Sequence, residues 1–210
     1  MIKVNSVWKS FGRFDALSNV TLEVETGQTV GIVGPSGSGK TTLMRLIAGL
    51  DKPDEGTVFI DGVLASTPDY ILEPSKRDVS AIFQTPALWP HMTVMENIDF
   101  VHSGRERNSN GILESVGLTD LRDKYPNELS GGEARMVSII RGLIADKKYL
   151  LMDEPLVNLN PELKNLLHEV IMEWTVGRRM GVLYITHDRS ELDYADKVYV
   201  MNNSILEPEP

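Results

Sequence analysis

A glycine-rich stretch near the N-terminus, GPSGSGKT at residues 34–41, constrains the fold more than any other part of the chain. It matches the pattern G-x-x-x-x-G-K-[S/T] at every fixed position. It lies between a short apolar run, QTVGIVG, and a stretch with apolar residues at helical spacing, TTLMRLIAGL. A buried parallel strand, a glycine loop and a helix in this order begin an α/β unit, so the sequence predicts an α/β fold.

The chemistry of this loop suits the phosphates of a nucleotide. Glycines allow backbone N–H groups to turn inward and approach the phosphates, and the helix that follows directs the positive end of its dipole at the anion. Lys40 adds a positive charge at the outer phosphates, and the Thr41 hydroxyl can bind Mg²⁺. The residues predicted to bind the nucleotide are Gly34, Pro35, Ser36, Gly37, Ser38, Gly39, Lys40, Thr41 and Thr42.

Two adjacent carboxylates follow another apolar run, in YLLMDEP. Neighbouring side chains on an extended chain point in opposite directions, so Asp153 and Glu154 cannot serve the same function. We expect Asp153 to face the phosphate loop and hold Mg²⁺, and Glu154 to act as general base on an attacking water. His187 and Gln84 also follow apolar runs and are candidates for orienting that water, with Gln84 also a metal ligand. The alternative for all four is a polar residue in a surface turn.

The rest of the chain alternates between strand patterns and helix patterns. The segments IKVNSV and VTLEVE alternate apolar and polar side chains as half-exposed strands do, and GTVFIDG, KYLLMD and GVLYIT predict further strands. Residues 85–127 differ in character and predict a small, mainly helical lobe with a flexible middle, HSGRERNSNG. The final EPEP is expected to be frayed.

Composition narrows the class of protein. The net charge of −9 argues against an exposed nucleic-acid surface, which needs clustered Lys and Arg. The chain contains no cysteine, which excludes disulfides and thiolate metal sites. A charge interrupts every long apolar run, so we expect that the chain does not cross a membrane by itself.

Taken together, the motifs GPSGSGKTT, FQ, LSGGE, LLMDEP and ITHD resemble, in order and spacing, those of the ATP-binding-cassette (ABC) ATPases over nearly the whole chain. LSGG is the signature of that family and is more specific than the phosphate loop. The resemblance implies a single domain, residues 1–210, with a P-loop NTPase core of the RecA-like type, an N-terminal antiparallel β subdomain and an inserted helical subdomain. We place the core and β subdomain at residues 1–84 and 137–210, and the helical subdomain at residues 85–136.

The resemblance also implies that two cassettes pack head to tail, with each ATP between the phosphate loop of one and the signature of the other. The signature residues that would contact the partner's ATP are Ser130, Gly131, Gly132 and Glu133. Asn158 and Asn160 would lie in an inter-subunit loop, and Phe11 would stack on adenine. Ser130 and Glu133 also form a helix capping box, which explains both without any ATP. For Phe11 the alternative is a core aromatic.

The chain departs from the family pattern at several positions. After DEP the family usually shows Ser-x-Leu-Asp, whereas this chain has VNLN. Asn160 still suits the N-cap of a helix that begins at Pro161 and can hydrogen-bond across a dimer, but it lacks the charge. Glu133 and Met136 stand where Gln and Arg are commoner. None of these changes removes the loop lysine, the acidic pair or the histidine, so we expect hydrolysis to survive.

By resemblance the chain is the ATPase subunit of a membrane importer, and residues 88–93, LWPHMT, resemble the segment where a membrane permease docks. Trp89 would lie at that interface, and the alternative is that it packs the helical lobe. The implied cofactors are ATP and Mg²⁺. The implied partners are a second ABC ATPase subunit, permease subunits and an extracytoplasmic solute-binding protein, with no nucleic acid, at the cytoplasmic face of the cell membrane. Three alternatives stay open: an exporter or lipid-extraction ATPase, a soluble cassette acting on nucleic acid or ribosomes, and a nucleotide switch that does not hydrolyse.

Overall fold

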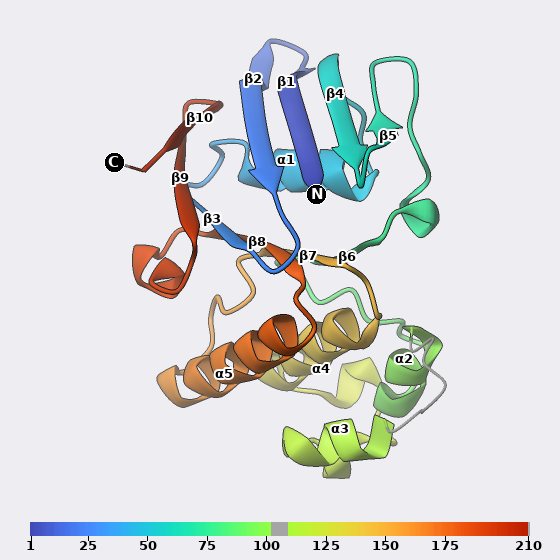
Figure 1. The fold of residues 1–210 in the computed structure, drawn as a ribbon. Helices are drawn as coiled ribbons and strands as arrows, with labels where there is room; N and C mark the ends of the chain where they lie inside the picture. The colour runs from blue at the N-terminus through green and yellow to red at the C-terminus, as the bar shows by residue number, and fades with distance from the viewer. Residues whose placement is uncertain (102–108, 210) are drawn as a thin grey trace.

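The computed structural model describes residues 1–101 and 109–209, and Figure 1 shows one helix held between two β-sheets, with further helices on the far side of the larger sheet. The strands are β1 (Ile2–Phe11), β2 (Phe14–Val24), β3 (Thr29–Val33), β4 (Glu55–Ile60), β5 (Val63–Ser66), β6 (Val79–Ile82), β7 (Tyr149–Asp153), β8 (Gly181–Thr186), β9 (Lys197–Asn202) and β10 (Ile205–Pro208). The α-helices are α1 (Lys40–Ala48), α2 (Val94–Val101), α3 (Ser109–Ser115), α4 (Gly131–Ile144) and α5 (Pro161–Gly177).

The smaller sheet is antiparallel throughout, in the order β2-β1-β4-β5. Its strands come from the segments in which apolar and polar residues alternate, because one face packs on α1 and the other meets solvent. The predicted antiparallel β subdomain at the N-terminus is therefore confirmed.

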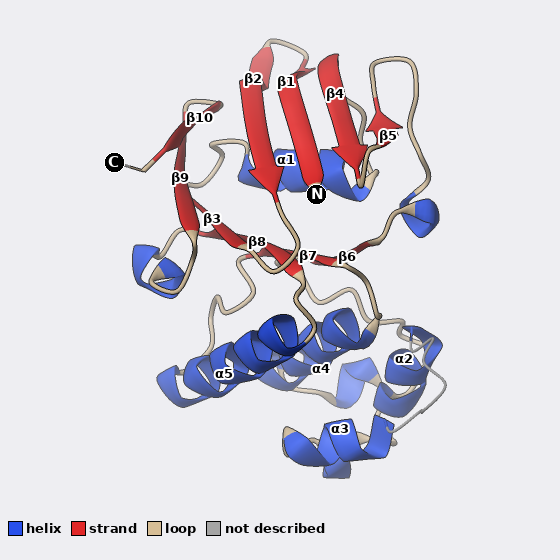
Figure 2. Cartoon of the chain, viewed as in Figure 1, coloured by secondary structure: helices blue, strands red, loops and turns tan. Residues whose placement is uncertain are grey.

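The larger sheet has the order β10-β9-β3-β8-β7-β6 and is parallel except for β10. Every residue of β7 and β8 is buried, since α1 and the small sheet cover one face while α4 and α5 cover the other (Figure 2). Strands β3, β7 and β8 are parallel neighbours, so their carboxyl ends lie at one edge of the sheet. The predicted α/β core of the P-loop type is confirmed, and this edge carries the motifs.

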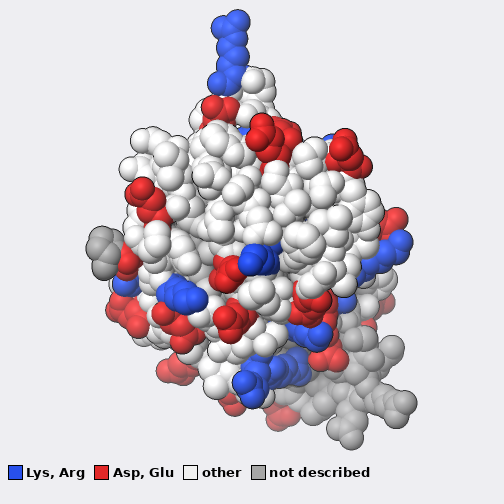
Figure 3. Space-filling view, turned by 45° about the horizontal axis from the view of Figure 1, so that its top comes forward, with Lys and Arg blue, Asp and Glu red and all other residues white. Residues whose placement is uncertain are grey.

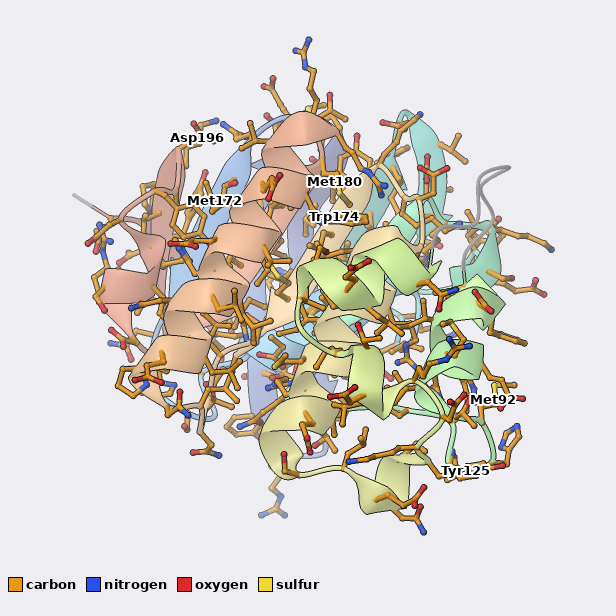
Figure 4. The ribbon with its side chains drawn as sticks, turned by 90° about the horizontal axis from the view of Figure 1, so that it is seen from below. Met92, Tyr125, Met172, Trp174, Met180 and Asp196 are labelled. Carbon is orange, nitrogen blue, oxygen red and sulfur yellow. The ribbon has the colours of Figure 1, made fainter. Side chains whose placement is uncertain are left out.

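Below the sheet, α4 and α5 pack side by side, with Trp174 on α5, and the shorter α2 and α3 lie to one side (Figure 4). Helix α4 contacts both α2 and strand β6, and it is continuous from Gly131 to Ile144. The expected subdomain boundary at residues 136 and 137 therefore falls inside this helix. Hydrogen bonds from the Val94 and Met95 amides to the carbonyls of Lys124 and Arg122 tie the start of α2 to the segment before α4.

The C-terminal tail differs from the expectation. The Glu209 amide donates to the Val198 carbonyl at 2.8 Å, and its carboxylate accepts from Arg189 at 2.7 Å. The prediction of a frayed EPEP is therefore wrong for residues 207–209, because β10 pairs with β9 and holds them. Residues 102–108 of the expected flexible segment lie outside the described part of the chain, and residues 109–111 begin α3.

On the face seen in Figure 3 the acidic and basic side chains are mixed with one another, and much of the upper part of this face carries neither. Among the described helices, none has both the length and the apolar character needed to span a bilayer.

Candidate functional site

The phosphate loop connects β3 to α1, and a glycine at its end is required by geometry. Gly39, the N-cap of α1, has φ = 109°, a conformation that side chains disfavour. A Cβ at this position would lie 2.1 Å from the Ala16 carbonyl oxygen. Glycine cannot cap the helix with a side chain, and the described first turn of α1 carries no acidic residue. The first amides of α1 are therefore suited to an anion.

Lys40 is the first residue of α1, and its side chain is 5% exposed. Its ammonium donates to the carbonyl oxygens of Gly34 and Pro35 at 2.7 and 2.8 Å, and it forms no ion pair with any residue that the structure describes. Burial lowers the pKa of Lys40, while the nearby Glu154 and Asp153 act in the opposite direction. A buried cation that is solvated by carbonyls alone suits an anionic ligand.

The candidate metal ligands meet beside this lysine. The Thr41 hydroxyl donates to Asp153 Oδ2 at 2.6 Å, which joins the start of α1 to the end of β7. Asp153 is 3% exposed, and burial raises its carboxyl pKa. A hydroxyl and a carboxylate are the oxygen ligands that Mg²⁺ prefers. Within the described residues no group of three or more His, Cys, Asp or Glu side chains could hold a metal by itself.

Glu154 stands just past the end of β7, with its backbone in the left-handed region at φ = 47°. Its amide donates to the Ile185 carbonyl at 2.8 Å. One carboxylate oxygen lies 3.3 Å from His187 Nδ1, and the other accepts from Gln84 Nε2 at 3.4 Å. Two of the side chains predicted to handle the attacking water, Gln84 and His187, are therefore both in contact with the third, Glu154.

Most predicted nucleotide and catalytic residues line one cavity of about 250 Å³, which we call the P-loop cavity. Its lining residues are Phe11, Phe14, Ala16, Ser36, Gly37, Gly39, Lys40, Thr41, Thr42, Gln84, Asp153 and Glu154. Phe11 is 52% exposed, which excludes the alternative of a core aromatic, and the Lys9 ammonium lies 5.4 Å from the centroid of its ring. His187 lines an adjoining pocket, and Ser38 is buried with no partner for its hydroxyl in the described structure.

The signature residues lie outside the P-loop cavity. Ser130 is the N-cap of α4, where its hydroxyl accepts from the Glu133 amide at 3.3 Å and the Glu133 carboxylate accepts from the Ser130 amide at 2.7 Å. The capping box predicted from the sequence is thus present. Ser130 and Gly131 are both exposed, and a Cβ on Gly131 would meet nothing within 4 Å among the described atoms. The start of α4 is a free surface.

The loop between β7 and α5 carries the two asparagines. Asn160 caps α5 through a hydrogen bond from the Leu163 amide to its Oδ1 at 2.8 Å, as predicted. Asn158 is exposed, and it lines a second pocket that also contains Gln84, Gly131 and Gly132. The inter-subunit loop and the signature therefore border the same hollow, beside the P-loop cavity.

Sequence reasoning missed Arg135, which is 3% exposed. Its guanidinium donates to the Phe83 carbonyl at 2.5 Å and to the Glu154 carbonyl at 2.7 Å. Burial lowers the pKa of Arg135, and Asp153, Tyr184 and Glu154 oppose that shift. The signal available in the sequence was an arginine in a largely apolar stretch, ARMVSIIRGLI, directly after the signature.

A groove of about 430 Å³ lies along the second half of α4, where Trp89, Ser138 and Arg141 are part of its lining. The Trp89 ring is covered by the Arg141 guanidinium at 4.5 Å and packs against the Phe100 ring at 4.6 Å. Asn97, fully buried, accepts from the Trp89 amide and donates to the carbonyls of Trp89, Met92 and Thr93. This amide fixes the segment that the sequence marks as a docking site.

The chain is similar in sequence to known import ATP-binding proteins. The family model described as "ABC transporter" matches residues 17–157. The trehalose/maltose import ATP-binding protein of Thermococcus litoralis is 36% identical over 98% of the chain, which spans 58% of that relative. The probable sulfate/thiosulfate import ATP-binding protein of Chlorella vulgaris is 36% identical over 96% of the chain, which spans 87% of it. The Fe(3+) ions import ATP-binding protein of Escherichia coli O157:H7 is 37% identical over 96% of the chain, which spans 59% of that relative. The chain thus spans less than two thirds of two of these three relatives.

Solved structures agree in fold. A bacterial ABC transporter cassette solved as a dimer has a TM-score of 0.85 and 28% identity, with 99% of this chain and 98% of that chain covered. The same values describe a dimeric cassette in a post-hydrolysis state, bound to ADP and phosphate.

Proposed function

The chain belongs to the ABC transporter family, and from this premise we propose that it is the ATP-hydrolysing subunit of an importer. The observation that carries the proposal is the separation of two sets of residues. Lys40, Thr41, Asp153 and Glu154 gather in the P-loop cavity, while the signature lies exposed outside it. Each chain then contributes one half to each of two shared ATP sites.

Binding of the triphosphate follows from the loop. The amides at the start of α1 and the buried Lys40 ammonium supply positive charge at the phosphates, and the exposed ring of Phe11, beside Lys9, would stack on adenine. Thr41 and Asp153 would hold Mg²⁺, which, when bound, offsets phosphate charge and orients the transferred group. Ser130 and the amides of the first turn of α4 would meet the γ-phosphate held by a second cassette.

Hydrolysis is assigned to the cluster around Glu154. Its carboxylate accepts a proton from the water that attacks the γ-phosphorus, as the bond from that phosphorus to the bridging oxygen of ADP breaks. Gln84 and His187, already within 3.4 Å of that carboxylate, orient the water and the γ-phosphate. Lys40 stabilises the charge on the phosphate oxygens during transfer.

Coupling to transport is proposed through the groove beside Trp89. Phe100 is 64% exposed and packs on Trp89, so the two rings form an apolar edge at which a membrane permease docks. Import as the direction is supported by the relatives, whose names are those of import ATP-binding proteins for sugar, sulfate/thiosulfate and iron. Peripheral attachment at the cytoplasmic face and a solute-binding protein outside belong to the same proposal.

Two measurements test it. The purified chain with ATP and Mg²⁺ is expected to release phosphate, and Glu154→Gln to abolish the release; a wild-type chain that binds ATP without turnover would favour the switch. For docking, Phe100→Ser is expected to reduce co-purification with a polytopic membrane protein. Val176→Ser is the matched control, since Val176 is 67% exposed on α5. Equal capture by both variants would remove Phe100 from the interface.

A further inference from the structure

We propose that Arg135 is a positioning residue for hydrolysis: from the helix that carries the signature, its guanidinium fixes the backbone on which Gln84 and Glu154 stand. The inference rests on the proposed function, because it names a residue that acts through the proposed base. Arg135 reaches two backbone carbonyls and no carboxylate among the described residues. Its hydrogen bonds therefore act on the backbone of the site, and its positive charge also acts on Asp153 and Glu154.

The two carbonyls lie where the sheet stops holding the chain. Pairing between β6 and β7 ends at Ile82 and Met152. Phe83 and Glu154 follow these positions, and Arg135 joins their carbonyls at 2.5 and 2.7 Å. A guanidinium suits this task because it is planar and presents several N–H donors in a fixed fork, so one side chain can hold two acceptors at a set separation.

The conformation of Glu154 needs this support. Its φ of 47° lies in the left-handed region, which residues with a side chain disfavour. Three hydrogen bonds hold it: the Glu154 amide to the Ile185 carbonyl, Arg135 to the Glu154 carbonyl, and the Val157 amide to the same carbonyl at 3.3 Å. Two donors reach the Glu154 carbonyl. The hydrogen bond from Arg135 is the stronger one, because it is shorter than the bond from the Val157 amide and its donor is charged.

Gln84 depends on the same guanidinium. Its carboxamide meets Glu154 at 3.4 Å, and its backbone begins at the carbonyl that Arg135 holds. Loss of Arg135 frees both sides of this contact together. The phosphate loop is held by separate bonds, between Lys40 and the carbonyls of Gly34 and Pro35. The variant should therefore lose turnover while it keeps its affinity for nucleotide.

The test compares Arg135→Met, which removes both donors, with Arg135→Lys, which keeps the charge but not the fork. Arg178→Met is the control, since Arg178 also donates to a backbone carbonyl of α4, that of Leu143, at the far end of the helix. Amide hydrogen exchange is measured without nucleotide. In Arg135→Met we expect faster exchange in peptides covering residues 80–88 and 152–158, with residues 34–42 unchanged. Arg178→Met should leave all three regions as in the wild type.

Kinetics supply the second measurement. We expect kcat to fall roughly 10- to 100-fold in Arg135→Met, as misplacement of a reacting group by about 1 Å can do, with KM for ATP within about threefold. Arg135→Lys should lie between Arg135→Met and the wild type.

The outcomes separate the two proposals. Unchanged exchange at residues 152–158 in Arg135→Met would overturn the positioning role, and so would an unchanged kcat in that variant. If exchange rises as expected but the wild-type chain hydrolyses no ATP, the positioning role stands and the proposed function fails.

Discussion

Replacement of Gly39 by alanine tests whether the end of the phosphate loop requires a glycine. An alanine Cβ there would lie 2.1 Å from the Ala16 carbonyl oxygen and 3.1 Å from Leu17 Cδ2, whereas ordinary contacts begin at 3.4 Å. The carbonyl belongs to strand β2 and cannot turn aside as a flexible side chain would. The backbone would also have to keep φ = 109° with a side chain attached.

The expected loss of stability in Gly39→Ala is the sum of a backbone cost and a packing cost. The unfavourable φ costs about 1 kcal/mol, and forcing an extra carbon into a packed site costs about 2 kcal/mol more. Gly37 is the matched control, because its φ of 78° imposes the first term while a Cβ there meets nothing within 4 Å in the described structure. We expect Gly39→Ala to lower the free energy of unfolding by about 3 kcal/mol and Gly37→Ala by about 1 kcal/mol.

The assay is thermal unfolding followed by circular dichroism without nucleotide, together with binding of a fluorescent ATP analogue. For a chain of this size 1 kcal/mol corresponds to about 2–4 °C, so the two variants should differ by several degrees. Gly39→Ala should also lose affinity for nucleotide, because α1 must shift away from β2. Equal melting temperatures for the two variants would refute the reasoning, since the collision would then cost nothing.

Three further predictions concern stability and the metal. Arg77→Met should lower the free energy of unfolding in urea by about 3 kcal/mol, because the buried guanidinium hydrogen-bonds to carbonyls at the end of α1 and in β5 that would be left unpaired. Replacement of its exposed neighbour, Lys76→Met, should leave that free energy unchanged. Equal effects of the two variants would contradict this account. Asn160→Ala should cost about 1 kcal/mol through loss of the cap on the Leu163 amide, whereas Asn160→Asp should cost nothing, as urea titration of both variants will test. Removal of Mg²⁺ with EDTA should stop phosphate release without changing the melting temperature of the nucleotide-free chain; turnover that persists in EDTA would exclude the proposed metal ligands.

The sequence was sufficient for the parts of the site whose chemistry is local. The phosphate loop, the acidic pair and the capping box each use residues within a few positions of one another, so their spacing alone predicts their geometry. The ends of parallel strands then bring Thr41, Asp153 and Gln84 to one edge of the sheet. These groups could be named before any coordinates were known.

Arg135 and Arg77 could not be assigned in this way. Arg135 bonds to carbonyls 52 and 19 residues away, and Arg77 to carbonyls 30 and 31 residues away. Backbone carbonyls are present at every residue, so no pattern in the sequence marks which of them will face a buried guanidinium. Only the packing of α4 and α1 against the sheets decides it.

The missed C-terminal hairpin has a different cause. Strands β9 and β10 are joined by Asn203 and Ser204, with φ of 45° and 69°. Two residues with positive φ are the mark of a tight hairpin turn, but its usual sequence is Asn-Gly or Asp-Gly. Serine in the second place hides the signal, and the Pro-rich end of the chain suggested fraying instead.

The central claim is that ATP is enclosed only when two of these chains meet. Its most direct test is the molecular mass of the Glu154→Gln variant in solution with ATP and Mg²⁺, measured by size-exclusion chromatography with light scattering. We predict a stable dimer that reverts to monomer when EDTA is added. A variant that binds one ATP per chain and remains a monomer under these conditions would contradict the shared site.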